Sequence, residues 1–337
     1  MILFLLSCLE PIYSNKKRSR ILLIIFHAIF LELFAVRMYC LISEFIVGRL
    51  LSLIEKIISL VMWWFVRMKM EKITDLVEQL ENLKKRVAFL ESQRIMKISK
   101  ISVAVVIMVM CLVPAIRTLY YTLSSNDRYS CISKMMYNLK TVGLISSFIY
   151  ELTNTYVYTV PSYAVCVFYT IYCKTFSVLL QCNQLTTSQA VQVKTKCVEI
   201  FKNFENTFSF LILVVFTFLL CSFFKIIFLF AYGIKIASYP LNYLYLIDFT
   251  SHSVLVIAMV LSADNIQERV NHINLMFEPN SAMDFSKQYL DILKNRASLS
   301  LTGWGMFTVR KPLLLSLLAW LFTYAVIILQ FFYTPSN

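Results

Sequence analysis

The last apolar stretch of the chain, Thr323 to Phe331, carries polar groups at a helical spacing. It reads TYAVIILQF, with a hydroxyl pair at its start and a primary amide near its end. In a helix, Thr323, Ile327 and Gln330 share one face, and Tyr324 and Phe331 form the stripe beside it. A lone chain in lipid must give that amide a partner, whereas a symmetric oligomer would repeat it as a ring. Amide rings and apolar constrictions select and gate ions, so the spacing favours a pore lining.

Two further apolar stretches carry polar side chains on one helical face. Around 141–166 these residues are spaced i, i+3, i+4 and i+7, and around 241–263 they are spaced i, i+3 and i+7. Aromatic rings with a few hydrogen-bonding groups suit a small-molecule pocket, and hydrogen bonding between helices without a ligand is the alternative. The candidate pocket residues are Tyr150, Glu151, Asn154, Thr155, Tyr158, Tyr245, Asp248 and His252.

The sequence contains no motif for catalysis or metal binding. It has three His, no H-E-x-x-H, no G-x-S-x-G and no P-loop, and its nine Cys show no metal spacing. We therefore expect neither an enzyme nor a cofactor or metal. A net charge of +13 would suggest nucleic acid as a partner of a soluble protein, but cytosolic loops of a membrane protein account for it better.

Membrane helices must position these residues. The 337 residues are 59% hydrophobic and 15% charged, with a mean hydropathy of +0.69, whereas soluble domains are nearer half apolar and a quarter charged. Continuous apolar runs favour helices over a β-barrel, so the expected fold is all-α with seven transmembrane helices. The predicted spans are 21–43, 46–68, 101–123, 141–166, 207–232, 241–263 and 312–334.

Lys and Arg are concentrated on one side of these spans. That side holds 23 of the 32 cations, so the positive-inside rule makes it cytosolic. The N-terminus is then cytosolic, and seven spans put the C-terminus outside the cell. We expect a cytosolic segment at 1–20, six helices within 21–263 with a cytosolic helical extension at 69–100, a cytosolic region at 264–311, and the last helix with a short extracellular tail at 312–337.

The extension at 69–100 contains an apolar seam at heptad spacing. Charged residues fill the gaps between the seam positions. Packing between the extended second and third helices of one chain is the favoured interpretation, and a coiled coil between subunits is the alternative. The seam consists of Ile73, Leu76, Leu80, Leu83, Val87 and Leu90.

The last helix resembles a family signature. Thr323-Tyr324, five apolar residues and Gln330-Phe331 match the T-Y-h-h-h-h-h-Q-F motif of the insect gustatory receptor family, and the preceding run TGWGMFTVRKP is similar to that family's segment before its final helix. The resemblance implies a tetrameric, ligand-gated, non-selective cation channel in the plasma membrane of a sensory neuron dendrite. It also implies that the last helices line the pore and that cytosolic extensions form a shared anchor at 264–311.

The resemblance also implies roles for residues. Ile327, Gln330 and Phe331 would form the gate, Thr323 and Tyr324 would brace the pore helix, and a tastant would bind the outer pocket. The expected partners are thus a small-molecule tastant, membrane lipid, permeant cations, and further copies or other gustatory receptor subunits. Ala325 follows Thr323-Tyr324 where the sugar-receptor branch carries Glu, which favours a divergent or bitter-type receptor and leaves a fructose-type receptor as an alternative.

Three other functions remain as alternatives. An odorant-receptor-type channel shares the architecture but usually has a less complete final motif. A G-protein-coupled receptor is suggested only by Asp127-Arg128-Tyr129, which falls in a predicted outer loop, and the last helix lacks N-P-x-x-Y. A secondary transporter would be expected to show an internal repeat, and none is evident.

Overall fold

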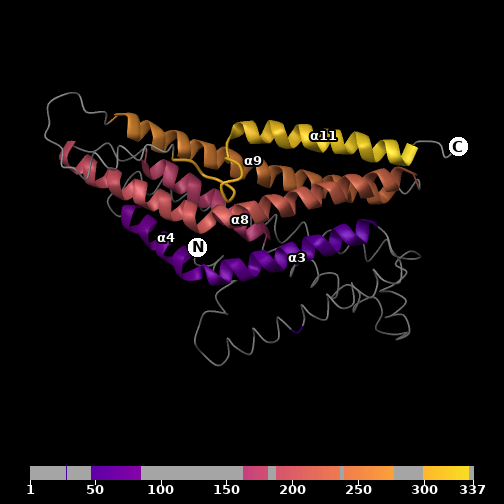
Figure 1. Ribbon diagram of the computed structural model, residues 1–337, viewed down its shortest axis with the longest axis horizontal. Helices are drawn as coiled ribbons and strands as arrows, with labels where there is room; N and C mark the ends of the chain where they lie inside the picture. The colour runs from indigo at the N-terminus through magenta and orange to yellow at the C-terminus, as the bar shows by residue number, and fades with distance from the viewer. Residues whose placement is uncertain are drawn as a thin grey trace.

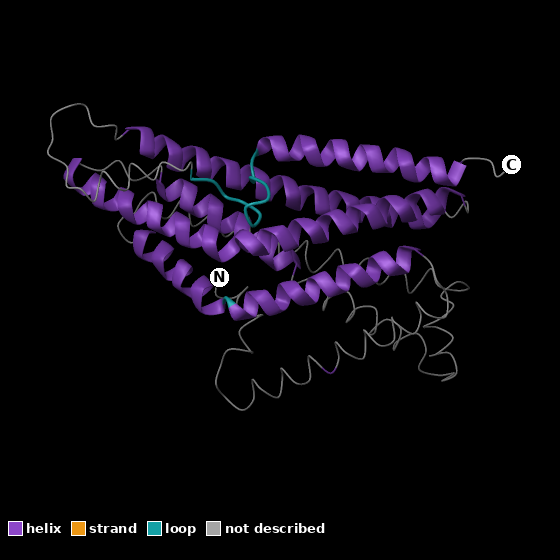
Figure 2. Ribbon diagram, viewed as in Figure 1, coloured by secondary structure: helices purple, strands orange, loops and turns teal. Residues whose placement is uncertain are grey.

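Apolar residues at helical spacing build a bundle of long helices in the computed structural model (Figures 1 and 2). The structure describes Ala28 and the ranges 47–84, 162–180, 187–235, 239–276 and 299–333. Within these ranges, residues 299–310 form a loop and the remaining long segments are helical. The helices are α3 (Val47–Met68), α4 (Met70–Lys84), Ser162–Leu180, α8 (Thr187–Lys235), α9 (Tyr239–Met276) and α11 (Lys311–Tyr333).

Two of the helices are much longer than a bilayer is thick. At about 1.5 Å per residue, the 49 residues of α8 extend for roughly 74 Å and the 38 of α9 for roughly 57 Å, against a hydrocarbon core of about 30 Å. The 23 residues of α11 match that thickness. Figure 1 shows α8 and α9 running on well past the start of α11. Both helices therefore combine a membrane length with an extension beyond it.

Four helices in the described ranges are long and apolar enough to cross a membrane. They are Ser162–Leu180, Lys196–Tyr232 within α8, Tyr245–Asn271 within α9, and Lys311–Phe331 within α11. The predicted span at 46–68 is a helix, α3, but Glu55, Lys56 and Arg67 keep it outside this group. Apart from Ala28, the spans predicted at 21–43 and 101–123 lie outside the described residues.

The predicted spans differ from the observed helices mainly at the ends that the charge distribution assigns to the cytosol. The predictions at 46–68 and 312–334 agree with α3 and α11 to within a residue. The prediction at 141–166 ended too early, because that helix continues to Leu180. The prediction at 207–232 was too short, since α8 begins at Thr187, and α9 continues past the span predicted at 241–263 to Met276.

The apolar face of α8 explains why it continues beyond the membrane run. Residues 196–205 alternate charged and apolar side chains, so a hydropathy window does not detect them. The apolar ones recur at helical spacing and are buried in the core. Their aromatic rings pack tightly, as in the parallel stack of Tyr172 on Phe204, with centroids 4.3 Å apart. The buried face comprises Cys197, Ile200, Phe201, Phe204 and Phe208.

The heptad seam is buried within the single chain. Ile73, Leu76, Leu80 and Leu83 all belong to the core, and α4 packs against α8. This part of the seam therefore packs inside one chain, with α8 as a packing partner, and the pairing with an extended third helix stays a prediction. Burial of these side chains leaves them unavailable for a coiled coil between subunits. Val87, Leu90 and the expected third helix lie outside the described residues.

Candidate functional site

The last helix lies along one edge of the bundle and keeps most of its surface uncovered. One narrow stripe of four leucines packs against the core. Large apolar side chains elsewhere on α11 are exposed, and Figure 1 shows the helix as an outer element of the bundle. The stripe consists of Leu313, Leu314, Leu317 and Leu321. The exposed side chains are Leu315, Leu318, Trp320, Phe322, Tyr324, Val326, Ile327, Leu329 and Phe331.

The predicted gate residues lie on this uncovered part of α11. Gln330 is exposed, as are Ile327 at 38% and Phe331 at 83%. Such exposure would be costly for an apolar helix in water, so lipid or another chain must cover it. These three side chains therefore lie on the surface of the single chain, which is the condition that a shared pore lining requires.

The two predicted bracing residues have different surroundings. Thr323 donates its hydroxyl to the carbonyl of Ala319 at 2.8 Å, a bond inside its own helix. Tyr324 contacts α8, because its ring lies edge-on to Phe224 with centroids 4.8 Å apart. It also contacts Trp320 one turn earlier. In the described chain, Tyr324 therefore joins α11 to α8, whereas Thr323 does not reach a neighbouring helix.

The structure brings two predicted pocket residues together on α9. Asp248 and His252 are both buried, and the His252 Nδ1 donates to the Asp248 carbonyl at 2.6 Å. Aromatic rings surround the imidazole, the nearest being Tyr163 with its centroid at 5.5 Å, together with Phe218 and Phe223 of α8. Tyr245 lies half-buried on the same helix. The other predicted pocket residues, Tyr150, Glu151, Asn154, Thr155 and Tyr158, lie outside the described residues.

An ion pair beside this group was not predicted. Lys225 of α8 donates to the carboxylate of Glu55 on α3, and both charges interact electrostatically with His252. No residue near Glu55 in the sequence identifies Lys225, 170 residues away, as its partner. The available signal was the isolation of Lys225 within the apolar run at 207–232, since a charge at that depth requires a partner.

A small hairpin leads directly into α11. Residues 299–310 fold back through an antiparallel bridge between Thr302 and Thr308, and the amide of Val309 donates to the carbonyl of Leu301 at 2.9 Å. The turn places Trp304 at φ 51° and Gly305 at φ 73°, both in the left-handed region. This hairpin occupies the TGWGMF segment that precedes the basic pair in the sequence.

Side chains of α8 hold one strand and the tip of the hairpin. The carboxylate of Glu205 accepts the Thr302 amide, with both oxygens at 3.0 Å, and also accepts the Thr302 hydroxyl. One turn further along α8, the hydroxyl of Ser209 accepts the amide of Trp304 at 2.8 Å. The hairpin therefore rests on polar groups from a helix about 100 residues earlier in the chain.

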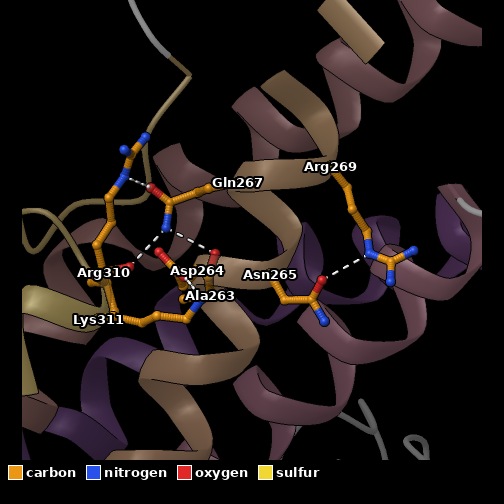
Figure 3. Close-up of polar contacts among 8 residues, drawn as sticks. Ala263, Asp264, Asn265, Gln267, Arg269, Arg310 and Lys311 are labelled. Carbon is orange, nitrogen blue, oxygen red and sulfur yellow. Dashed lines mark hydrogen bonds and ion pairs between the residues drawn. The ribbon is translucent and has the colours of Figure 1, made fainter. Parts of the chain in front are cut away.

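Gln267 of α9 holds both strands of the hairpin, and Figure 3 shows its contact with Arg310. Its amide nitrogen donates to the carbonyls of Val309 at 2.8 Å and Ala263 at 2.9 Å. Its oxygen accepts the amide of Leu301 at 3.0 Å and the guanidinium of Arg310 at 3.4 Å. The side chain is 1% exposed, so water does not compete for these bonds.

Comparison with known proteins gives a structural match only. No family model matches the chain, and neither does any curated protein. The structure of the insect olfactory receptor OR5 from Machilis hrabei is similar, with a TM-score of 0.65, 16% identity and coverage of 94% of this chain and 90% of that chain. The same receptor in complex with eugenol gives a TM-score of 0.61 and 13% identity, with the same coverage. At these identities the similarity concerns the fold: the chain has the fold of an insect chemoreceptor, as its last helix led us to expect.

Proposed function

We propose that the chain is a subunit of an insect chemoreceptor, a ligand-gated cation channel that a small molecule opens. The observation that carries the proposal is α11, an apolar helix of membrane length whose Ile327, Gln330 and Phe331 lie uncovered in a fold shared with an insect olfactory receptor. Further copies of the chain around an axis would bury the exposed side of α11 and bring the Gln330 amides together.

Four copies are the expected number, because the family resemblance implies a tetramer. In that arrangement Phe331 and Ile327 form apolar constrictions, and Gln330 supplies polar groups that hydrate a passing cation. The leucine stripe and Tyr324 keep each α11 attached to its own bundle. The expected location is the plasma membrane, with the C-terminus outside the cell and, by the family resemblance, in the dendrite of a sensory neuron.

The ligand site that we propose surrounds His252 in the half of the bundle nearer the predicted extracellular ends of α8 and α9. Aromatic rings from Ser162–Leu180 and α8 meet Asp248 and His252 there, next to the ion pair of Glu55 and Lys225. This combination suits an aromatic or apolar small molecule with one or two hydrogen-bonding groups. The OR5 structure in complex with eugenol supports a ligand of this kind.

A tastant is our first choice of ligand, because the complete T-Y-h-h-h-h-h-Q-F motif resembles gustatory receptors. The second candidate is an odorant, which the structural similarity to an olfactory receptor favours. A taste receptor and an odorant receptor would differ in the ligand and share the same opening mechanism. A small molecule binds the open state more tightly than the closed state and so shifts the population toward the open state.

Electrical recording from cells that express the full chain tests the proposal. Calcium imaging against sugars, alkaloids, amino acids and eugenol would identify an active compound, and patch recording would then detect unitary cation currents. Saturable uptake of a labelled solute without unitary current would support a transporter instead. An epitope after Asn337 that stains only in permeabilised cells would reject the predicted topology.

A further inference from the structure

We propose that Gln267, together with Asp264 one turn earlier on α9, is a positioning residue for α11. The inference rests on the proposed function only where it calls α11 the pore helix. Gln267 forms hydrogen bonds with the hairpin at 299–310, and Asp264 forms an ion pair with Lys311, the first residue of α11. Together they make α9 the element that determines where α11 begins.

The side-chain amide of Gln267 makes all the hydrogen bonds that its two polar atoms can make. Both of its polar atoms make two hydrogen bonds, and three of the four partners belong to the hairpin: Leu301, Val309 and Arg310. The two strands are thereby tied to one side chain as well as to each other. Because this side chain is buried, removing its polar atoms would leave the Leu301 amide and the Val309 carbonyl without their partners on α9.

The link from this side chain to α11 is very short. Arg310, which donates to Gln267, also accepts the amide of Leu313 at 2.9 Å through its carbonyl, and that bond starts the first turn of α11. The ammonium of Lys311 lies 2.9 Å from the carboxylate of Asp264. Figure 3 shows Arg310 extending to Gln267 and Lys311 extending to Asp264. A shift of α9 at this turn would thus be transmitted to the start of α11.

The same helix carries the proposed ligand site. Gln267 follows His252 by 15 residues, which is about 22 Å along a continuous helix. The opposite side of the hairpin is held by Glu205 and Ser209 of α8. The hairpin therefore bridges α8 and α9, and movement of α9 relative to α8 has to displace it. This arrangement gives the ligand site a continuous physical connection to the pore helix.

Hydrogen exchange of the purified full chain in lipid nanodiscs tests the proposal. In Gln267→Met the side-chain length is kept and the polar atoms are lost. We expect roughly tenfold faster exchange in peptides covering 299–310 and also 311–317. The matched control is Asn265→Ala, which removes only the Arg269 bond at 2.8 Å on the other side of the same turn (Figure 3). The control should exchange like the wild type in both peptides.

Two results would overturn the proposal. One is wild-type exchange of 299–310 in Gln267→Met, and the other is a change confined to the hairpin with 311–317 unaffected. Should Gln267→Met fail to fold, Asp264→Asn replaces it, because Lys311 is 62% exposed and the core is not disturbed. That variant is expected to accelerate exchange in 311–317, and wild-type exchange there would equally refute the positioning role.

Electrical recording from the same variants tests the role of Gln267 separately from the proposed channel function. We expect Gln267→Met to change the ligand-free open fraction severalfold, with Asn265→Ala unchanged. A wild-type chain that never conducts would reject the proposed function, and the exchange data would still decide the role of Gln267. If the wild type conducts and Gln267→Met leaves the ligand-free open fraction unchanged, Gln267 does not position a pore helix.

Discussion

Glu55 of α3 and Lys225 of α8 form an ion pair inside the helix bundle, 170 residues apart in the chain. Their side chains are only 11% and 17% exposed. Both charges interact electrostatically with His252, and the pair connects two helices that pack against each other. It therefore fixes how α3 sits against the proposed ligand site.

Breaking this pair should destabilise the protein more than removing a surface charge. Glu55→Ala leaves the Lys225 ammonium buried without its carboxylate, at an expected cost of about 3 kcal/mol. Thermal unfolding in detergent measures the loss, and Glu78→Ala on the exposed side of α4 is the control. The double variant Glu55→Leu with Lys225→Met should recover most of the stability, since both charges are then gone. Equal losses for Glu55→Ala and Glu78→Ala would contradict the pairing.

The sequence predicted those parts of the fold that depend on local composition. Apolar runs of bilayer length located α3 and α11 to within a residue, and the heptad spacing identified Ile73 and Leu76 as buried. The polar spacing on α9 placed Asp248 and His252 on one face, and the structure shows both buried against aromatic rings.

Contacts between residues far apart in the chain could not be predicted from the sequence. Nothing near Glu55 specifies Lys225, and nothing near Gln267 specifies a hairpin 34 residues later. The length of α8 was also missed, because charged residues interrupt the apolar run while one face stays buried. A search for amphipathic continuation past each apolar run would have detected this part of α8.

The hairpin should tolerate a methyl group at Gly305 better than at Gly303. A Cβ at Gly303 would lie 2.3 Å from the ring of Phe307, which packs against Phe216, so the ring cannot withdraw freely. Gly303→Ala should cost about 2 kcal/mol through overpacking. At Gly305 there is open space, and the left-handed φ of 73° alone costs about 1 kcal/mol.

The comparison uses unfolding midpoints of the two alanine variants in the same detergent. If Gly303→Ala is the milder change, the Phe307 ring does not pack over Gly303 as described. The combination Gly303→Ala with Phe307→Leu provides a second check, because the smaller side chain makes room for the methyl group and should restore part of the loss.

Substitutions at the α9 group should change ligand sensitivity and leave assembly intact. His252→Ala removes a ring that contacts Tyr163, Phe218 and Phe223, and we expect about a tenfold higher half-maximal concentration of an active compound. Asp248→Ala should act in the same direction. Val254→Ala is the control, because Val254 is 60% exposed on the same helix. An unchanged dose response in both test variants, with normal surface expression, would place the ligand elsewhere.

Gln330 should set the conductance of the open pore. In Gln330→Ala the polar ring is lost between the apolar side chains of Ile327 and Phe331, so a passing cation loses hydration and the unitary conductance should fall roughly two- to fivefold. Ile328→Ala is the matched control, since position 328 lies about 200° around the helix from Gln330 and is half-buried. Surface expression of both variants is measured alongside. Wild-type conductance in Gln330→Ala, or an equal fall in Ile328→Ala, would show that the face carrying Gln330 does not line the permeation path.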